Sequence, residues 1–305
     1  MGVLAKPRKK IHFVFKSHHP NEPYALPGMP FPETKTTIFE ASSGVLRGHS
    51  KQYISALTER ARGMDLGHNA SELLEHVGKF LPKGKRAIAG ESGNPLQLTK
   101  LKAMDAALDR AELRFHRNPS FENYLKSLAL NAKHMRYRHL LIRNTIRRQR
   151  KSGVPLVANY GYTHSLLSAE LHSRGIDSSR AMTAREFNPH ETVLRKLVRG
   201  KKVKELSQKE LQEGYLSELL FTPLSQGLFG KEKIGSDTEA RFHSIVMHAL
   251  LRGLSNPERV SLVLSPSLDA LLRFNGIKSL DDPAFEKVLL KNSIFFRRLA
   301  GRQKK

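Results

Sequence analysis

Cysteine and tryptophan are both absent from this chain of 305 residues. Without thiols, the protein cannot form disulfide bridges, zinc–thiolate centres or a cysteine nucleophile. A metal ligand or catalytic group must therefore come from histidine, carboxylate, hydroxyl or basic side chains. Hydrophobic residues make up 39% of the chain, so a folded core is still expected.

Long apolar runs are also missing from the sequence. No segment approaches the roughly 20 apolar residues that a membrane-spanning helix requires. After a basic start, the apolar run at 11–15 is short and contains His12, whereas a secretory signal needs a longer apolar segment. The sequence therefore predicts a protein with no transmembrane segment, located in the cytoplasm.

Acidic residues are few relative to basic ones. Asp and Glu total 28 against 52 Lys and Arg, which gives a formal net charge of +24. Such a charge attracts polyanions, namely nucleic acid, an anionic membrane, or phosphorylated and acidic substrates, although a generally basic surface without a specific partner explains it equally well. No RNP, KH or zinc-finger signature is present. The basic residues are densest in four segments, at 6–10, 136–151, 195–204 and 297–305.

The first part of the chain alternates short apolar strands with helical segments, which include 96–115 and 121–151. Strands are expected at 11–15, 36–39, 87–89 and 154–160. The last of these is a nearly continuous apolar run, as in a buried parallel strand. The alternation predicts an α/β fold with a mostly parallel sheet flanked by helices.

The longest helical signal, at 121–151, carries one apolar stripe. Its members recur at spacings of three and four: Leu125, Leu128, Ala132, Met135, His139, Ile142 and Ile146. Because His139 lies on this stripe, we expect a core histidine there rather than a ligand.

Beyond Pro189 the pattern becomes wholly helical. Gly, Pro and Ser separate the expected helices at 192–199, 208–221, 238–254, 257–264, 267–274 and 283–298. The predicted organisation is an α/β core at 1–189 with an added all-helical, basic C-terminal region at 190–305.

Polar residues at strand ends are the candidates for chemistry, because ligands of an open parallel sheet bind outside the carboxyl ends of its strands. His18 follows the first strand, Glu40 ends the second, and His164 follows the strand at 154–160 in a Gly-x-x-His turn. Gly161 permits a tight turn there, and the start of the next helix favours a neutral imidazole that binds a metal or accepts a proton. A capping or loop histidine and an exposed strand-end glutamate remain the alternatives.

Arg143, near the end of the long helix, is the fourth candidate. Its guanidinium suits an anion or a developing negative charge, while a solvated basic face is the competing interpretation. The predicted catalytic set is thus His18, Glu40, Arg143 and His164. A divalent metal, if bound, is expected on His18, Glu40 and His164. No P-loop, G-x-S-x-G or H-E-x-x-H motif is present.

The order of these features resembles the TIKI/TraB/ChaN-like (erythromycin-esterase-like) superfamily. The resemblance spans 11–187: a strand ending at His18, a strand ending at Glu40, the helical pair Arg143-Asn144, and the Gly-x-x-His turn at His164. Members typically carry Gly-Glu-x-His at the first motif, whereas this chain has Lys16 in place of the glutamate. The resemblance implies a hydrolase, and Lys16 implies a site that repels a metal or binds an anion instead.

Two functions follow as expectations. The first is a hydrolase, metal-assisted or based on His and Glu, acting on a small-molecule or peptide substrate. The second is a catalytically degenerate binding protein for an anionic ligand, nucleic acid or a protein partner. A role of the helical region in protein interaction is a third, weaker option.

Overall fold

The computed structural model describes most of the helical part of the chain and the backbone of several strands. The described residues are 11–16, 36–42, 47–50, 86–91, 93–151, 156–161, 166–173, 178–182, 187–230, 234, 237–293 and 296. Among the strand residues, side chains are described only at Gly90 and Glu91.

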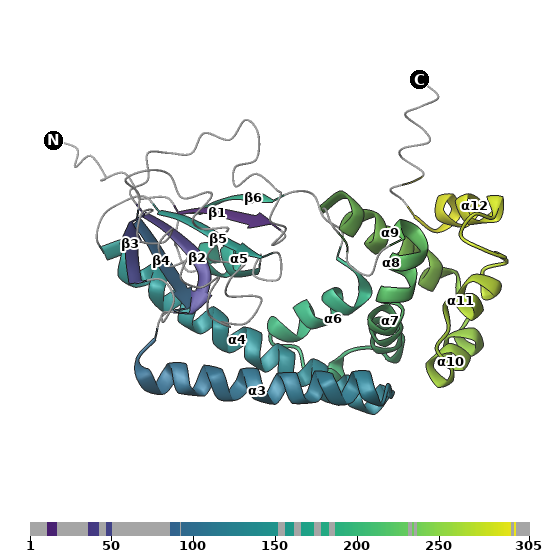
Figure 1. Cartoon of the computed structure of the whole chain (residues 1–305), viewed down its shortest axis with the longest axis horizontal. Helices are drawn as coiled ribbons and strands as arrows, with labels where there is room; N and C mark the ends of the chain where they lie inside the picture. Colours follow the sequence, from purple (N-terminus) through teal and green to yellow (C-terminus); the bar gives the residue numbers. More distant parts are fainter. Residues whose placement is uncertain are drawn as a thin grey trace, which may run out of the picture. The chain divides into compact units, whose positions relative to one another are not determined.

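The chain divides into two compact units. Unit 1 comprises Met1–Asp105 and His134–Thr183, and unit 2 comprises Ala106–Lys133 and Ala184–Lys305. Two long helices, α3 (Pro95–Arg117) and α4 (Phe121–Lys151), belong partly to each unit (Figure 1). Unit 2 therefore takes in a helical hairpin as well as the C-terminal region. The proposed boundary at 189 remains a prediction.

Unit 1 contains short strands whose backbones pair in the order β3-β4-β2-β5-β1-β6. All described pairings are parallel except that between β3 and β4. The strands are β1 (Ile11–Lys16), β2 (Thr36–Ser42), β3 (Arg47–Ser50), β4 (Arg86–Glu91), β5 (Leu156–Gly161) and β6 (Ser178–Met182). The helix α5 (Leu166–Ser173) buries Leu167 and Leu171 completely.

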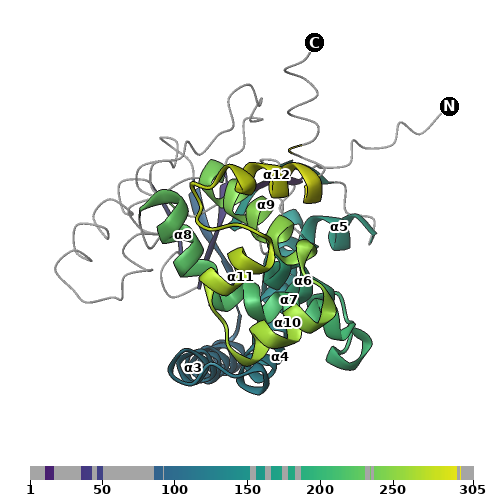
Figure 2. The same cartoon turned by 90° about the vertical axis from the view of Figure 1, so that its right-hand side faces the viewer.

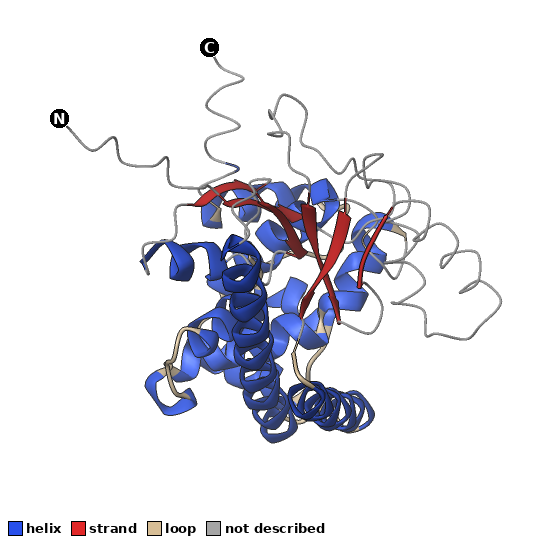
Figure 3. Cartoon of the chain, turned by 90° about the vertical axis from the view of Figure 1, so that its left-hand side faces the viewer, coloured by secondary structure: helices blue, strands red, loops and turns tan. Residues whose placement is uncertain are grey.

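The predicted α/β class is wrong for the core that the structure describes. In the stretches 93–151, 187–230 and 237–293, nine α-helices account for 80% of the residues and no sheet is present. Helices α3 and α4 were expected to cover a sheet. Instead Phe115, Tyr124 and Leu128 join a hydrophobic cluster formed with other helices. Figure 3 shows how fully helix dominates the described part of the chain.

Unit 2 is completed by seven further α-helices (Figure 2). The prediction that 190–305 is helical is confirmed for its described residues. The helix expected at 208–221 ends at Leu219, and a further helix that was not expected follows it at Phe221–Phe229. The helices are α6 (Pro189–Val198), α7 (Gln208–Leu219), α8 (Phe221–Phe229), α9 (Asp237–Gly253), α10 (Asn256–Leu264), α11 (Leu268–Phe274) and α12 (Pro283–Asn292).

Local capping signals explain where several of these helices begin. Asn188 and Glu191 form a capping box at α6, and Ser207 and Glu210 form another at α7. Each box satisfies backbone N–H groups that the first helical turn leaves without partners. At α12, the Asp282 carboxylate accepts a hydrogen bond from the backbone N–H of Ala284, at 2.8 Å.

The core of unit 2 is a single hydrophobic cluster with an aromatic group at one end. Leu216, Leu224 and Leu250 are fully buried within it. Tyr124 and Tyr215 lie edge to face, with ring centroids 5.6 Å apart. Burial of such side chains contributes roughly 1.5–3 kcal/mol each, so this cluster is the main source of stability of unit 2.

The predicted apolar stripe of α4 is confirmed. Leu128, Ala132, Met135, Ile142 and Ile146 are all buried, and so is the imidazole of His139. Leu125, the remaining member of the stripe, is half-buried. The regular spacing puts all of these residues on one face, and that face turns inward as far as Ile146.

The side chain of Tyr124 on α4 reaches α7 at Gly214. A Cβ atom at this position would collide with the hydroxyl of Tyr124, and it would lie 3.4 Å from Cγ2 of Val193. The hydroxyl of Tyr124 in turn lies 3.3 Å from Nδ1 of His190 on α6. Glycine in the middle of a helix is intrinsically unfavourable, so its presence here reflects this contact.

We expect Gly214→Ala to lower the free energy of unfolding by about 1–3 kcal/mol, because overpacking outweighs the gain in helix propensity. The double variant Y124F/G214A should recover part of this loss, since it removes the colliding oxygen. Urea unfolding followed by circular dichroism measures both values, with Y124F alone as the control. Equal or greater stability of the G214A variant would show that the collision is relieved by other means.

Candidate functional site

Three of the four predicted catalytic residues have no described side chain. His18 and His164 lie outside the described residues, and Glu40 lies in β2 with only its backbone described. Their convergence on one site therefore stays a prediction, as does a divalent metal on His18, Glu40 and His164. Within the described residues, no group of three or more histidines and carboxylates could hold a metal ion.

Arg143, the fourth predicted residue, is described and already has a partner. Its guanidinium donates a hydrogen bond to the carboxylate of Glu170 on α5, and the two form an ion pair. The side chain of Arg143 is only 16% exposed. A second arginine on α4, Arg138, similarly donates from Nε to the buried Glu91, at 2.6 Å. Both arginines therefore neutralise carboxylates in unit 1 rather than presenting a free charge.

A different basic group stands out in unit 2, in the connection from α6 to α7. Arg199, Lys201, Lys202 and Lys204, which we call the basic turn, are all exposed. Among the residues that the structure describes, no carboxylate forms an ion pair with any of them. The four cations therefore remain available to an external anion.

The backbone of the basic turn begins with a tight reversal at the end of α6. The N–H of Lys201 donates to the carbonyl of Lys196, at 3.2 Å, and the N–H of Gly200 donates to that of Leu197, at 2.9 Å. This pair of bonds defines a Schellman motif, which needs a residue with positive φ. Gly200 supplies it, with φ of 106°. The reversal thus directs the lysines that follow away from the helix.

The second half of the basic turn is held by a short 3-10 helix, η2 (Val203–Glu205), and by the buried Leu206. The carboxylate of Glu205 accepts a hydrogen bond from the backbone N–H of Lys202, at 2.9 Å. This carboxylate therefore stabilises the backbone of the turn.

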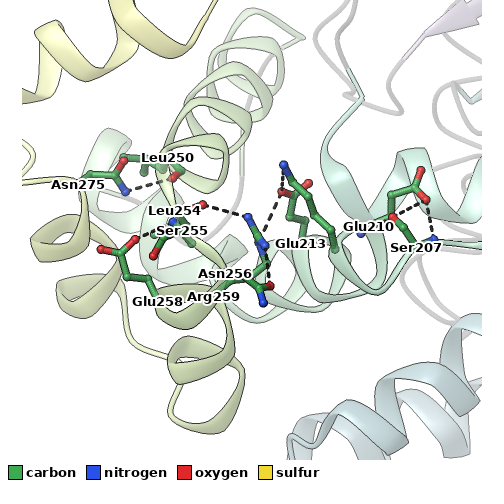
Figure 4. Close-up of polar contacts among 11 residues, drawn as sticks. Ser207, Glu210, Glu213, Leu250, Leu254, Ser255, Asn256, Glu258, Arg259 and Asn275 are labelled. Carbon is green, nitrogen blue, oxygen red and sulfur yellow. Dashed lines mark hydrogen bonds and ion pairs between the residues drawn. The ribbon is translucent and has the colours of Figure 1, made fainter.

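Helix α7 starts immediately after the turn and fixes its far end. In its capping box, the N–H of Ser207 donates to Glu210 at 2.9 Å, as Figure 4 shows. Glu210 also forms an ion pair with Lys196 of α6. These contacts lower the pKa of Glu210 to about 2, through the Lys196 hydrogen bond first and the Ser207 backbone second.

Further along α7, a pair of opposite charges connects this helix to α10. Glu213 lies 3.7 Å from Nε of Arg259, a residue of α10 that is only 4% exposed (Figure 4). Nη2 of Arg259 donates to the carbonyl of Leu254, at 3.0 Å. Burial raises the pKa of Glu213, while Lys209 and Arg259 oppose that rise. This pair joins two helices and is largely shielded from solvent.

In the sequence, 195–204 is one of four densely basic segments, and the polar residues at strand ends are the stronger candidates for a site. The missed signal was the combination of local motifs around that charge. Gly200 marks the end of one helix, and Ser207-x-x-Glu210 marks the start of the next. Together they place the lysines in an exposed, well-defined connection.

No protein-family model matches this chain, and neither curated proteins nor solved structures match it. No family is therefore assigned to the chain, and the resemblance to the TIKI/TraB/ChaN-like superfamily stays an expectation. In the described part of the chain, no helix has the length and apolar character needed to cross a membrane.

The lowered pKa of Glu210 gives a test of the junction that holds the basic turn. A carboxyl group whose pKa is depressed on folding stabilises the fold above its unfolded-state value, near 4.5, and loses this contribution as the pH falls toward 2. We expect Glu210→Gln to lower the free energy of unfolding by about 1 kcal/mol at pH 7. The difference from the parent chain should shrink between pH 4.5 and pH 2.

Urea unfolding at pH 7, 5, 3 and 2 measures this difference. Lys196→Gln provides the matched control, because its effect should largely disappear in the E210Q background. A gap between parent and E210Q that stays constant down to pH 2 would contradict the assigned pKa.

Proposed function

We propose that this chain binds nucleic acid, through contacts of the basic turn with the phosphate backbone. The observation that carries the proposal is the presence of four exposed cations within six residues, on a turn whose backbone is held at both ends. A fixed turn keeps these charges close together, so less conformational entropy is lost when an anion binds. The excess of basic residues over the whole chain supports a polyanionic partner.

The chemistry of the turn favours recognition of phosphates over recognition of bases. The residues from Arg199 to Leu206 include no aromatic side chain, so the turn offers no surface on which bases stack. Lysines contact phosphates as point charges and carry no sequence information. We therefore expect binding that depends weakly on sequence and strongly on salt.

The hydrolase remains a separate expectation. Its residues His18, Glu40 and His164 have no described side chains, and Arg143 is paired with Glu170. No observation in the described part of the chain favours it.

A cytoplasmic location belongs to the present proposal. It is in keeping with a chain that has no cysteine and a basic surface suited to nucleic acid.

A salt titration tests the proposal. Fluorescence anisotropy with a labelled single-stranded RNA and a labelled DNA duplex gives the affinity between about 50 and 200 mM salt. Replacing the four cations of the turn by glutamine should weaken binding at least about tenfold at the lower salt. It should also reduce the slope of log affinity against log salt by about 3, because each lost phosphate contact contributes roughly 0.7–0.9.

The matched control removes the same charge elsewhere in unit 2. It replaces four exposed cations of α11, α12 and the loop between them by glutamine: Arg273, Lys278, Lys287 and Lys291. This variant should keep most of the affinity and of the salt slope. An equal loss of affinity in both variants would mean that net charge, and not the basic turn, determines binding to nucleic acid. Binding to vesicles of anionic lipid but to neither nucleic acid would overturn the proposal.

A further inference from the structure

Unit 2 contains a groove lined by residues of α3 and α4. Figure 1 shows the short turn that joins these two helices. The groove has a volume of about 460 Å³. Its floor includes three alanines, Ala107 and Ala111 of α3 and Ala129 of α4, none of which is buried. Small residues at these positions leave a trough that larger side chains would fill.

The walls of the groove are positively charged. Arg110 and Arg114 of α3 and Lys126 of α4 line it, and its lining contains no carboxylate. Within the described part of the chain, neither arginine has an ion-pair partner. Lys126 contacts Glu122 at 2.6 Å, but this is an exposed pair within one helix and competes weakly with an external anion. The occupant should therefore be negatively charged.

The lining residues are arranged as in a groove that binds a helix. Ala107, Arg110, Ala111 and Arg114 follow the spacing i, i+3, i+4, i+7, so they form one stripe along about two turns of α3. A third helix packs into the trough between two neighbouring helices when small residues allow its backbone to come close. Its apolar residues would contact the alanines, and its acidic residues would meet the arginines.

Other ligand classes fit this groove less well. The cationic side chains and Ala129 are exposed, so the groove cannot bury most of the surface of a small molecule. Its lining contains no aromatic side chain on which a nucleic-acid base could stack.

We propose that the α3–α4 groove binds an acidic amphipathic helix of a partner protein, with its apolar stripe on the alanine floor and its carboxylates on Arg110 and Arg114. This recognition mode combines shape, through the alanines, with charge, through the arginines. It does not depend on the nucleic-acid function, because it uses a different surface of unit 2.

The test uses a labelled synthetic peptide of about 20 residues, with leucines at spacings of three and four on one face and glutamates beside them. Fluorescence anisotropy should show saturable binding to the full chain. A peptide of the same composition with the leucines scattered should bind at least about tenfold more weakly, because it presents no apolar stripe.

Two variants examine charge and shape separately. The double variant R110E/R114E should lose at least about tenfold in affinity for the acidic peptide, and a peptide with lysine in place of glutamate should bind to it in return. The double variant A107L/A111L fills the trough without a change of charge and should also lose affinity. Circular dichroism confirms that each variant keeps its helix content.

The control for charge is K287E/K291E, which reverses two exposed cations with the same i, i+4 spacing on α12. It should bind the acidic peptide as the parent chain does. Equal binding of the scattered peptide, an equal loss in the α12 control, or no binding by the parent chain would overturn the proposal. Loss of RNA binding in R110E/R114E, with the acidic peptide unbound by the parent chain, would assign the groove to nucleic acid instead.

Discussion

The contact between Tyr124 and Gly214 is the constraint on which the rest of unit 2 depends. The Tyr124 hydroxyl of α4 occupies the space that a side chain at position 214 of α7 would need, and it lies beside His190 of α6. Three helices are thus located by one buried side chain. Because α4 lines the groove and α6 and α7 carry the basic turn, both proposed surfaces rest on this junction.

Positive charge serves two purposes in this protein, and burial separates them. Arg138, Arg143 and Arg259 are largely shielded from solvent, and each compensates the charge of a carboxylate that lies beside it. The basic turn and the arginines of the groove are exposed and have no described carboxylate partner. Only the second group is available for recognition, which is why net charge alone did not locate the two proposed surfaces.

Sequence-based prediction was accurate where the deciding interactions join residues that are close in the sequence. The helices of 190–305 were predicted well, since caps such as Ser207-x-x-Glu210 and apolar stripes act within a few residues. Helix α8 was missed because Pro223 and Gly227 within it are residues that local propensity disfavours inside a helix, although proline is tolerated in a first turn. The α/β class was wrong for the described core, because the partner of the apolar face of α4 is decided by long-range packing. The strand-end site at His18, Glu40 and His164 stays a prediction.

The sequence by itself determined the helical segments, the buried stripe of α4, the excess of positive charge and the exclusion of thiol chemistry. Each of these depends on residue type and on spacing along the chain. Only the tertiary structure decided which cations are neutralised, which helix meets Gly214, and where Ala107, Ala111 and Ala129 form one groove. Those features join residues distant in sequence, and the free energy that brings such residues together comes from burial of surface that no local pattern records.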